Sequence, residues 1–92
     1  MKNNAIKINE KDNVAIAMHN VAKNETVVVD GQSLLAAIED IEAGHKIALS
    51  AIALGEKVYR YGEPIVEATR DINQGAWVHV HNTQPILGEL KE

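Results

Sequence analysis

Apolar residues alternate with other residues in several short runs of this chain, at the period of two that is typical of β-strands. The clearest run, Trp77 to Asn82, places two valines on one side and His79 and His81 on the other. A second run, Val14 to His19, alternates Val, Ile and Met with Ala, Ala and His. Both runs predict half-buried strands, and the first predicts a strand that presents two imidazoles on one face.

Three segments share the pattern Ile-x-x-Gly-x-x-(Ile/Val), and they begin at Ile41, Ile52 and Ile72. In each segment an apolar anchor precedes a glycine that can adopt a positive φ angle in a tight turn, and a strand is expected to follow. The spacings between the segments, 11 and then 20 residues, are unequal, which argues against a solenoid repeat. The pattern therefore indicates short strands joined by tight turns.

Residues 26–29 are β-branched and end at Asp30-Gly31, a dipeptide that favours two-residue hairpin turns. A returning strand is expected to begin near Gln32. Residues 33–40 also fit a short helix with a serine cap. The strand is favoured because the Asp-Gly turn explains the residues on both of its sides.

Residues 58–61 alternate again, residues 62–64 are expected to turn, and a further extended piece begins at Ile65. Pro64 lacks a backbone N–H group, so a central strand would tolerate it poorly. Together these patterns predict a mostly β protein with about six or seven short strands. We expect residues 1–92 to form a single domain.

The composition limits the core and the partners. Of 92 residues one is Trp, two are Tyr and none is Phe, so the core is expected to consist of small and branched aliphatic side chains. A domain of this size buries a limited share of its surface. We therefore expect a partner chain to cover part of the apolar surface, or a second copy of the chain when it is isolated.

The charge distribution and the absence of cysteine narrow the class further. A formal net charge of −4 with scattered Lys and Arg argues against nucleic acid and membrane surfaces as partners. The chain has no Cys, which excludes thiolate chemistry and favours a cytoplasmic location. Residues 1–10 lack the apolar core of a signal peptide, which favours the same location.

The second half of the chain carries short motifs in a fixed order. They are Gly44-His-Lys-Ile-Ala-Leu49, Ile52-x-x-Gly-Glu-x-Val58, Tyr61-Gly-x-Pro-Ile65, Ala68-Thr-x-Asp-Ile72, Gly75 and Val78-His-Val-His-Asn82. Together they resemble the N-terminal SAF domain of the altronate and galactarate dehydratase family. In that family the domain is fused to a larger catalytic region or is encoded beside it as a small subunit. The resemblance implies a β-clip fold of short, bent hairpins with little helix.

The resemblance also implies a function, namely the dehydration of sugar acids by a two-component lyase. The chain would contribute one wall of a composite active site and would be inactive alone. Its expected partners are a larger dehydratase subunit and a small sugar acid. The expected cofactor is a divalent metal, iron in the best-known members, held mainly in the complex with the large subunit. Two alternatives stay open: the small subunit of sulfolactate sulfo-lyase, and a SAF module that stabilises a larger subunit without chemistry.

The candidate site residues lie in the matched motifs. His79 and His81 are the candidate catalytic pair, because two imidazoles on one strand face suit proton transfer or, alternatively, metal coordination. Without the resemblance, two half-exposed histidines on an edge strand would be the plainer interpretation. Regular alternation places Trp77 on the same face, as a pocket or interface wall. The candidate substrate-binding residues are His45, Lys46, Tyr61 and Asn82.

Overall fold

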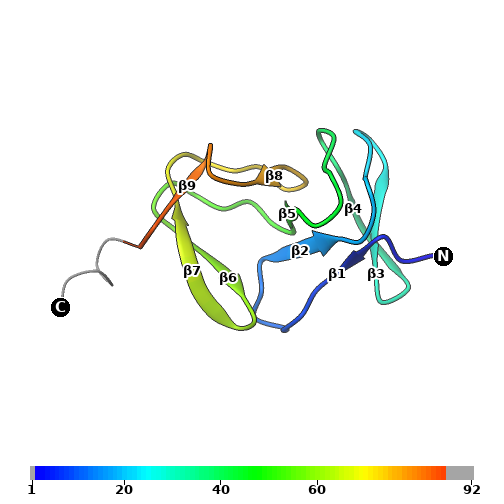
Figure 1. Ribbon diagram of the computed structural model, residues 1–92, viewed down its shortest axis with the longest axis horizontal. Coiled ribbons are helices and arrows are strands. Elements are labelled where there is room, and N and C mark those ends of the chain that lie inside the picture. The colour runs from blue at the N-terminus through cyan, green and yellow to red at the C-terminus, as the bar shows by residue number, and fades with distance from the viewer. Residues whose placement is uncertain (1, 87–92) are drawn as a thin grey trace.

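The computed structural model describes residues 2–86, which form nine short β-strands and no helix (Figure 1). The strands are β1 (Ala5–Ile6), β2 (Val14–Ala17), β3 (Thr26–Val29), β4 (Gln32–Ala36), β5 (Lys46–Ala48), β6 (Lys57–Arg60), β7 (Glu63–Ala68), β8 (Trp77–Val78) and β9 (Thr83–Gln84). They pair in three antiparallel sheets, β1-β2-β5-β8, β3-β4 and β6-β7-β9. The mostly β prediction is confirmed, although the described residues form more strands than the six or seven expected. Among them no helix could cross a membrane.

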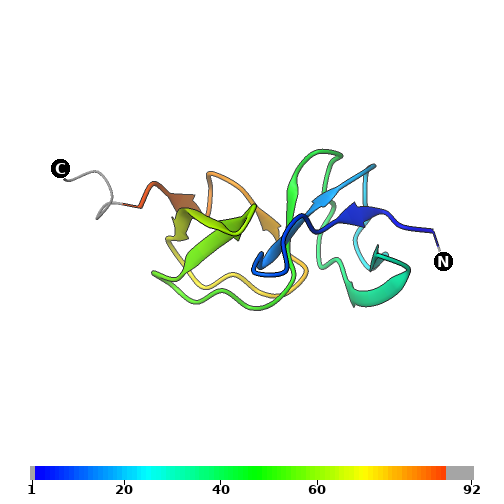
Figure 2. The ribbon, with the colours of Figure 1, turned by 90° about the horizontal axis from the view of Figure 1, so that it is seen from below.

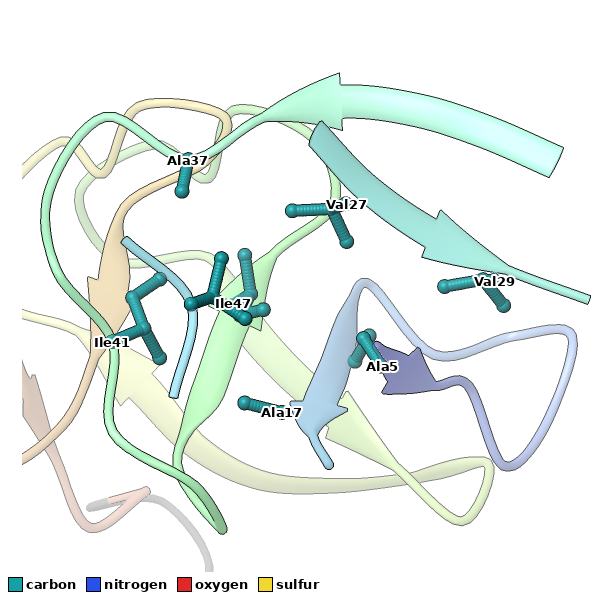
Figure 3. Packing of buried hydrophobic residues seen from close by; sticks show 9 residues of the cluster. Ala5, Ala17, Val27, Val29, Ala37, Ile41 and Ile47 are labelled. Atoms are coloured by element: carbon teal, nitrogen blue, oxygen red, sulfur yellow. The ribbon is translucent and has the colours of Figure 1, made fainter. Parts of the chain in front are cut away.

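The four-stranded sheet lies between two hydrophobic cores. On β5, Ile47 belongs to the first core and Ala48 to the second, because successive strand residues point to opposite faces. The hairpin β3-β4 covers the first core, and its packing is shown in Figure 3. The hairpin β6-β7 covers the second core, and the two hairpins lie at opposite ends of an elongated molecule (Figure 2).

Strand β2 differs from the half-buried strand that its alternation predicts. It ends at Ala17, and both of its faces are largely buried. Val14 packs into the second core, whereas Ala15 and Ala17 pack into the first. The prediction of one solvated face is wrong because two cores flank this strand, and the small alanines let the second layer approach.

The turn-and-strand motif occurs four times in the structure. The fourth copy begins at Val21 and has Asn24, with φ of 75°, where the other copies have glycine. Asparagine is one of the few residues that tolerate this left-handed region. With Val21 included, the anchors Ile41, Ile52 and Ile72 complete a spacing of 20, 11 and 20 residues, so the fold repeats every 31 residues.

Hydrogen bonds repeat with the same offset. The side-chain amide of Asn4 bonds two backbone groups of β3, and that of Asn13 bonds two backbone groups of β6. Glu25 and Glu56 each accept the backbone N–H three residues before them. The unequal spacing seen in the sequence is therefore the signature of a duplicated unit that contains two motifs.

Both long hairpins turn through two residues of positive φ. These are Asp30 (50°) and Gly31 (77°) in the first hairpin, and Tyr61 (59°) and Gly62 (76°) in the second. This geometry is that of a type I′ turn. The prediction of a strand directly after Asp-Gly is confirmed by β4, and the helix alternative for residues 33–40 is wrong.

The second hairpin corrects the turn expected at residues 62–64. The turn comes one residue earlier, and Pro64 lies within β7, the middle strand of its sheet. Pro64 is tolerated there because β9 pairs only with the last two residues of β7. In addition, the register with β6 shifts between Val58 and Tyr59, where Tyr59 faces Pro64.

Candidate functional site

The strand expected from Trp77 to Asn82 ends at Val78. Residues 79–82 form a turn in which the backbone N–H of Asn82 donates to the carbonyl of His79 over 3.1 Å. The buried side chain of Asn82 also accepts from the His79 N–H and donates to the Trp77 carbonyl, both at 2.9 Å. Val80 is consequently 78% exposed instead of packed. The strand prediction is wrong here because these local bonds compete with sheet pairing.

Three imidazoles nevertheless gather around the indole of Trp77. The ring of His79 stacks on it, with centroids 5.1 Å apart and planes at 13°. The ring of His81 lies 4.9 Å away, and that of His45 lies 5.4 Å away. His45 precedes β5, whose Ile47 pairs with Trp77 in the sheet. We call these four residues, His45, Trp77, His79 and His81, the His-Trp cluster.

The His-Trp cluster is held by specific hydrogen bonds and stays partly open to solvent. The indole N–H of Trp77 donates to Nδ1 of His45 over 2.9 Å. The backbone N–H of Trp77 donates to the carboxylate of Glu39 over 2.9 Å, and the guanidinium of Arg70 donates to the His81 carbonyl over 3.1 Å. His81 is exposed and the other three cluster residues are half-buried.

Sequence reasoning missed two contributors to this site. Glu39 anchors the backbone of Trp77 from 38 residues away, and Arg70 reaches the turn from the segment after β7. Neither residue carries a sequence signal, because each acts through a long-range contact with a backbone group. The Trp77 side chain lies beside the imidazoles, as the alternation indicated, and its hydrogen bond to His45 depends on the pairing of β5 with β8.

Lys46 lies apart from the His-Trp cluster. Its register partners are Ile16 and Val78, so it projects from the face of the central sheet opposite to Ile47 and Trp77. Burial, together with the nearby charge of Arg60, lowers the pKa of Lys46 below its ordinary value. The structure therefore does not bring this predicted substrate-binding lysine together with His45.

Tyr61 also lies elsewhere, at the tip of the β6-β7 hairpin. Its side chain is exposed, and the guanidinium of Arg60 lies over its ring at 4.9 Å from the centroid. A hollow of about 450 Å³ beside this hairpin is lined by residues that include Asn13, Lys57 and Tyr59. None of the imidazoles lines that hollow, so the His-Trp cluster is a surface feature and not the wall of this cavity.

The described part of the chain does not form the metal site that the resemblance implies. Within residues 2–86 no three His, Asp or Glu side chains are arranged to hold a metal ion. His79 and His81 offer two imidazoles, whereas Nδ1 of His45 is engaged by Trp77. A metal ion at this place would need further ligands from outside residues 2–86.

Comparison with known proteins decides the family. Residues 3–85 match the profile described as the altronate/galactarate dehydratase SAF domain, a range that contains all nine strands and the His-Trp cluster. The chain belongs to this SAF-domain family. The family resemblance noted in the sequence and its all-β fold are thereby confirmed.

Curated relatives agree with this assignment of the SAF domain. It is 44% identical over 87 residues to altronate dehydratase of Escherichia coli, which covers 95% of this chain and 17% of that protein. It is 40% identical over 86 residues to altronate dehydratase of Bacillus subtilis, with coverage of 94% and 17%. The (2R)-sulfolactate sulfo-lyase subunit alpha of Paracoccus pantotrophus is 44% identical over 48 residues, which cover 52% of this chain and 72% of that subunit. The SAF domain is thus homologous to a small part of known hydro-lyases.

Proposed function

We propose that this SAF domain is the small component of a two-component lyase that dehydrates sugar acids of the altronate or galactarate type. The His-Trp cluster is the observation that best supports the proposal, because it gathers three imidazoles on an open face of the molecule. The match to altronate dehydratases covers only 17% of their length, which leaves most of each enzyme for a catalytic region. We propose a larger dehydratase chain as the partner that closes the site.

The chemistry requires groups that transfer protons. In a dehydration the proton on the carbon beside the carboxylate goes to a base, and its bonding electrons form a double bond as the neighbouring hydroxyl leaves. That hydroxyl takes up a proton and departs as water, and the resulting enol becomes a 2-keto acid. His79 and His81 suit these transfers, because imidazole exchanges protons near neutral pH and no residue among 2–86 engages their ring nitrogens.

The cofactor and the location stay predictions. We propose a divalent metal, with iron as the ion that the family resemblance implies, held mainly by the partner chain. In that case His79 and His81 have the alternative role of contributing ligands at its edge. A cytoplasmic location, a sugar-acid substrate and self-association of the isolated chain are likewise proposals.

A second candidate function is supported by one comparison. The relative that this chain covers most fully is a sulfo-lyase subunit, of which 72% is matched. That protein is by its name one subunit of a lyase, as proposed here for the SAF domain. We therefore keep the elimination of sulfite from sulfolactate as the alternative reaction.

The test is an assay of the assembled enzyme. The chain is coexpressed with the dehydratase-family chain encoded nearest to it, and turnover of altronate, galactarate and sulfolactate is measured with and without the SAF chain. The expected result is turnover of one of these acids that depends on the SAF chain. Turnover that is the same without it would refute the proposal.

A double variant separates chemistry from mere stabilisation. Replacing His79 and His81 by Ala is expected to lower kcat by at least about 100-fold, the usual contribution of proton-transfer groups. The matched control is His19→Ala, because His19 is exposed and lies outside the His-Trp cluster. Full activity of the double variant would instead support a SAF module without a chemical role.

A further inference from the structure

The hydrogen bond between Trp77 and His45 determines where His45 carries its proton. An indole nitrogen can only donate, so the Nδ1 atom that accepts from it at 2.9 Å must present a lone pair. The single ring proton of the neutral imidazole then resides on Nε2. The orientation of the ring follows from the same bond, because a flipped ring would place a C–H group against the indole N–H.

Both partners of this hydrogen bond are held in place by their own backbones. His45 donates its N–H to the Glu42 carbonyl and accepts from the Ala17 N–H. Trp77 is bonded at its N–H by Glu39 and at its carbonyl by Asn82. The bond therefore joins two fixed segments, β5 and β8, that neighbour each other in the central sheet. Such a pair is preorganised, so little reorganisation is needed when a ligand arrives.

The Nε2–H group of His45 has no acceptor among residues 2–86, and the half-buried ring leaves it a donor for an external oxygen. In this tautomer His45 cannot take up a proton at Nε2 or bind a metal ion there unless the bond to Trp77 breaks. We propose that His45 is a hydrogen-bond donor to an oxygen of the sugar acid, its carboxylate above all, and that Trp77 is its positioning residue. This inference rests on the proposed function and assigns a different task to His45 than to His79 and His81.

Nuclear magnetic resonance on the 92-residue chain tests the tautomer without any partner. At a pH of about 9, well above the ordinary histidine pKa of about 6.5, the imidazoles are neutral. Pyrrole-type and pyridine-type nitrogens then resonate in separate 15N ranges, and Nδ1 of His45 is expected in the pyridine-type range. A pyrrole-type Nδ1 in the wild-type chain would overturn the inference, whether or not a lyase partner exists.

The single Trp of the chain supplies a second readout, since its indole N–H gives one resonance. In His45→Asn the amide oxygen can replace Nδ1 as the acceptor, whereas in His45→Gln the amide lies near the position of Nε2. The indole resonance is therefore expected to stay close to its wild-type position in His45→Asn and to shift in His45→Gln. The opposite pattern would contradict the assignment of the acceptor.

The same two variants test the task of His45 in the assembled enzyme. An oxygen donor is preserved in His45→Gln and lost in His45→Asn, so the Asn variant is expected to show a kcat/KM about tenfold or more below that of the Gln variant, mainly through KM. Equal loss in both variants would show that His45 acts as a base or a metal ligand and would overturn the proposal. An assembled wild-type enzyme without turnover would refute the proposed function, while the resonance data would still decide the tautomer.

Trp77→Phe tests the positioning role, because Phe keeps an aromatic ring in the cluster and removes the N–H donor. The expected result is a changed 15N shift of His45 Nδ1 together with a several-fold rise in KM. An unchanged Nδ1 shift would refute the role of Trp77. Far-ultraviolet circular dichroism on each variant verifies that the strands are retained.

Discussion

At the residue scale, Asp12 links the N-terminal segment to the tip of the β6-β7 hairpin. It is 5% exposed, and its carboxylate accepts backbone N–H groups of Asn9 (3.1 Å), Tyr61 (3.1 Å) and Gly62 (2.8 Å). Burial alone would raise the pKa of Asp12, but these three donors, together with the charge of Lys7, outweigh it. The pKa of Asp12 therefore lies below its ordinary value of 3.8.

Asp12→Asn is expected to lower the free energy of unfolding at pH 7 by about 1–3 kcal/mol, because an amide NH₂ would face backbone donors. Since the folded state lowers the pKa of Asp12, the carboxylate stabilises the fold above about pH 3.8 and less as the pH falls through the folded pKa. The difference between wild type and variant should therefore shrink near pH 3. Urea unfolding at both pH values measures it, with Asp71→Asn, at an exposed carboxylate that accepts one N–H, as the control. An equal loss at both pH values would contradict the account.

Gly75 is the turn glycine for which close packing adds to the conformational requirement. Its φ is 88°, and a Cβ atom there would collide with the carbonyl oxygen of Ala36. Gly44 has nearly the same φ, 86°, but open space around it. Gly44→Ala should cost about 1–2 kcal/mol through φ alone. Gly75→Ala should cost at least about 3 kcal/mol, because β4 must also move. Thermal unfolding of both variants measures the difference, and equal costs would be inconsistent with the packing at Gly75.

At the element scale, the turn of residues 79–82 shapes the His-Trp cluster. Asn82 ties its two ends together, and Thr83 adds a hydroxyl that donates to the His79 carbonyl over 2.8 Å. The turn thus replaces two residues of strand by a loop that carries His79 and His81 beside the indole. The orientation of the imidazoles therefore depends on this turn and not on a strand face.

Asn82→Ala is expected to destabilise the fold by about 1–3 kcal/mol, because two backbone groups lose their buried partner. It should also change the near-ultraviolet circular dichroism of the single Trp, since the stack of His79 on Trp77 relaxes. The control is Asn20→Ala, which removes one exposed bond to the Ala43 N–H. An unchanged Trp signal in Asn82→Ala would show that the stack does not depend on this side chain.

At the scale of the whole molecule, two cores share one central sheet. β2 and β5 contribute side chains to both cores, so neither hairpin can lose its core without exposing the back of the same strands. The 31-residue duplication makes the two cores structurally equivalent. Ile41 and Ile72 are equivalent anchors, 1% and 3% exposed, one in each core.

Ile41→Ala and Ile72→Ala are each expected to lower the free energy of unfolding by about 2–5 kcal/mol. Because the strands are shared, unfolding should stay a single transition in which circular dichroism and Trp fluorescence coincide. Trp77 packs against the first core, so fluorescence reports on that half. Separate transitions in Ile72→Ala, with fluorescence changing later than circular dichroism, would show that the two halves unfold independently.

The sequence by itself determined the class of the fold and the place of most turns. Alternation with β-branched residues specifies strands, and Asp30-Gly31 specifies its hairpin, because both depend on local φ/ψ preferences. The fourth motif escaped notice because Asn24 replaces glycine, although its positive φ is the same in kind. The duplication follows from the sequence once this substitution is admitted.

Only the tertiary structure decided which candidate residues meet. His45 and Lys46 are neighbours in the chain, yet the pairing of β5 with β8 sends Lys46 to the face opposite Trp77. The bond from Trp77 to His45 joins residues 32 positions apart, and Asn82 converts an alternating run into a turn. Local preferences set the backbone of each short segment, whereas contacts between side chains depend on how distant strands pair. Hence the strands could be predicted from the pattern, and the arrangement of the imidazoles could not.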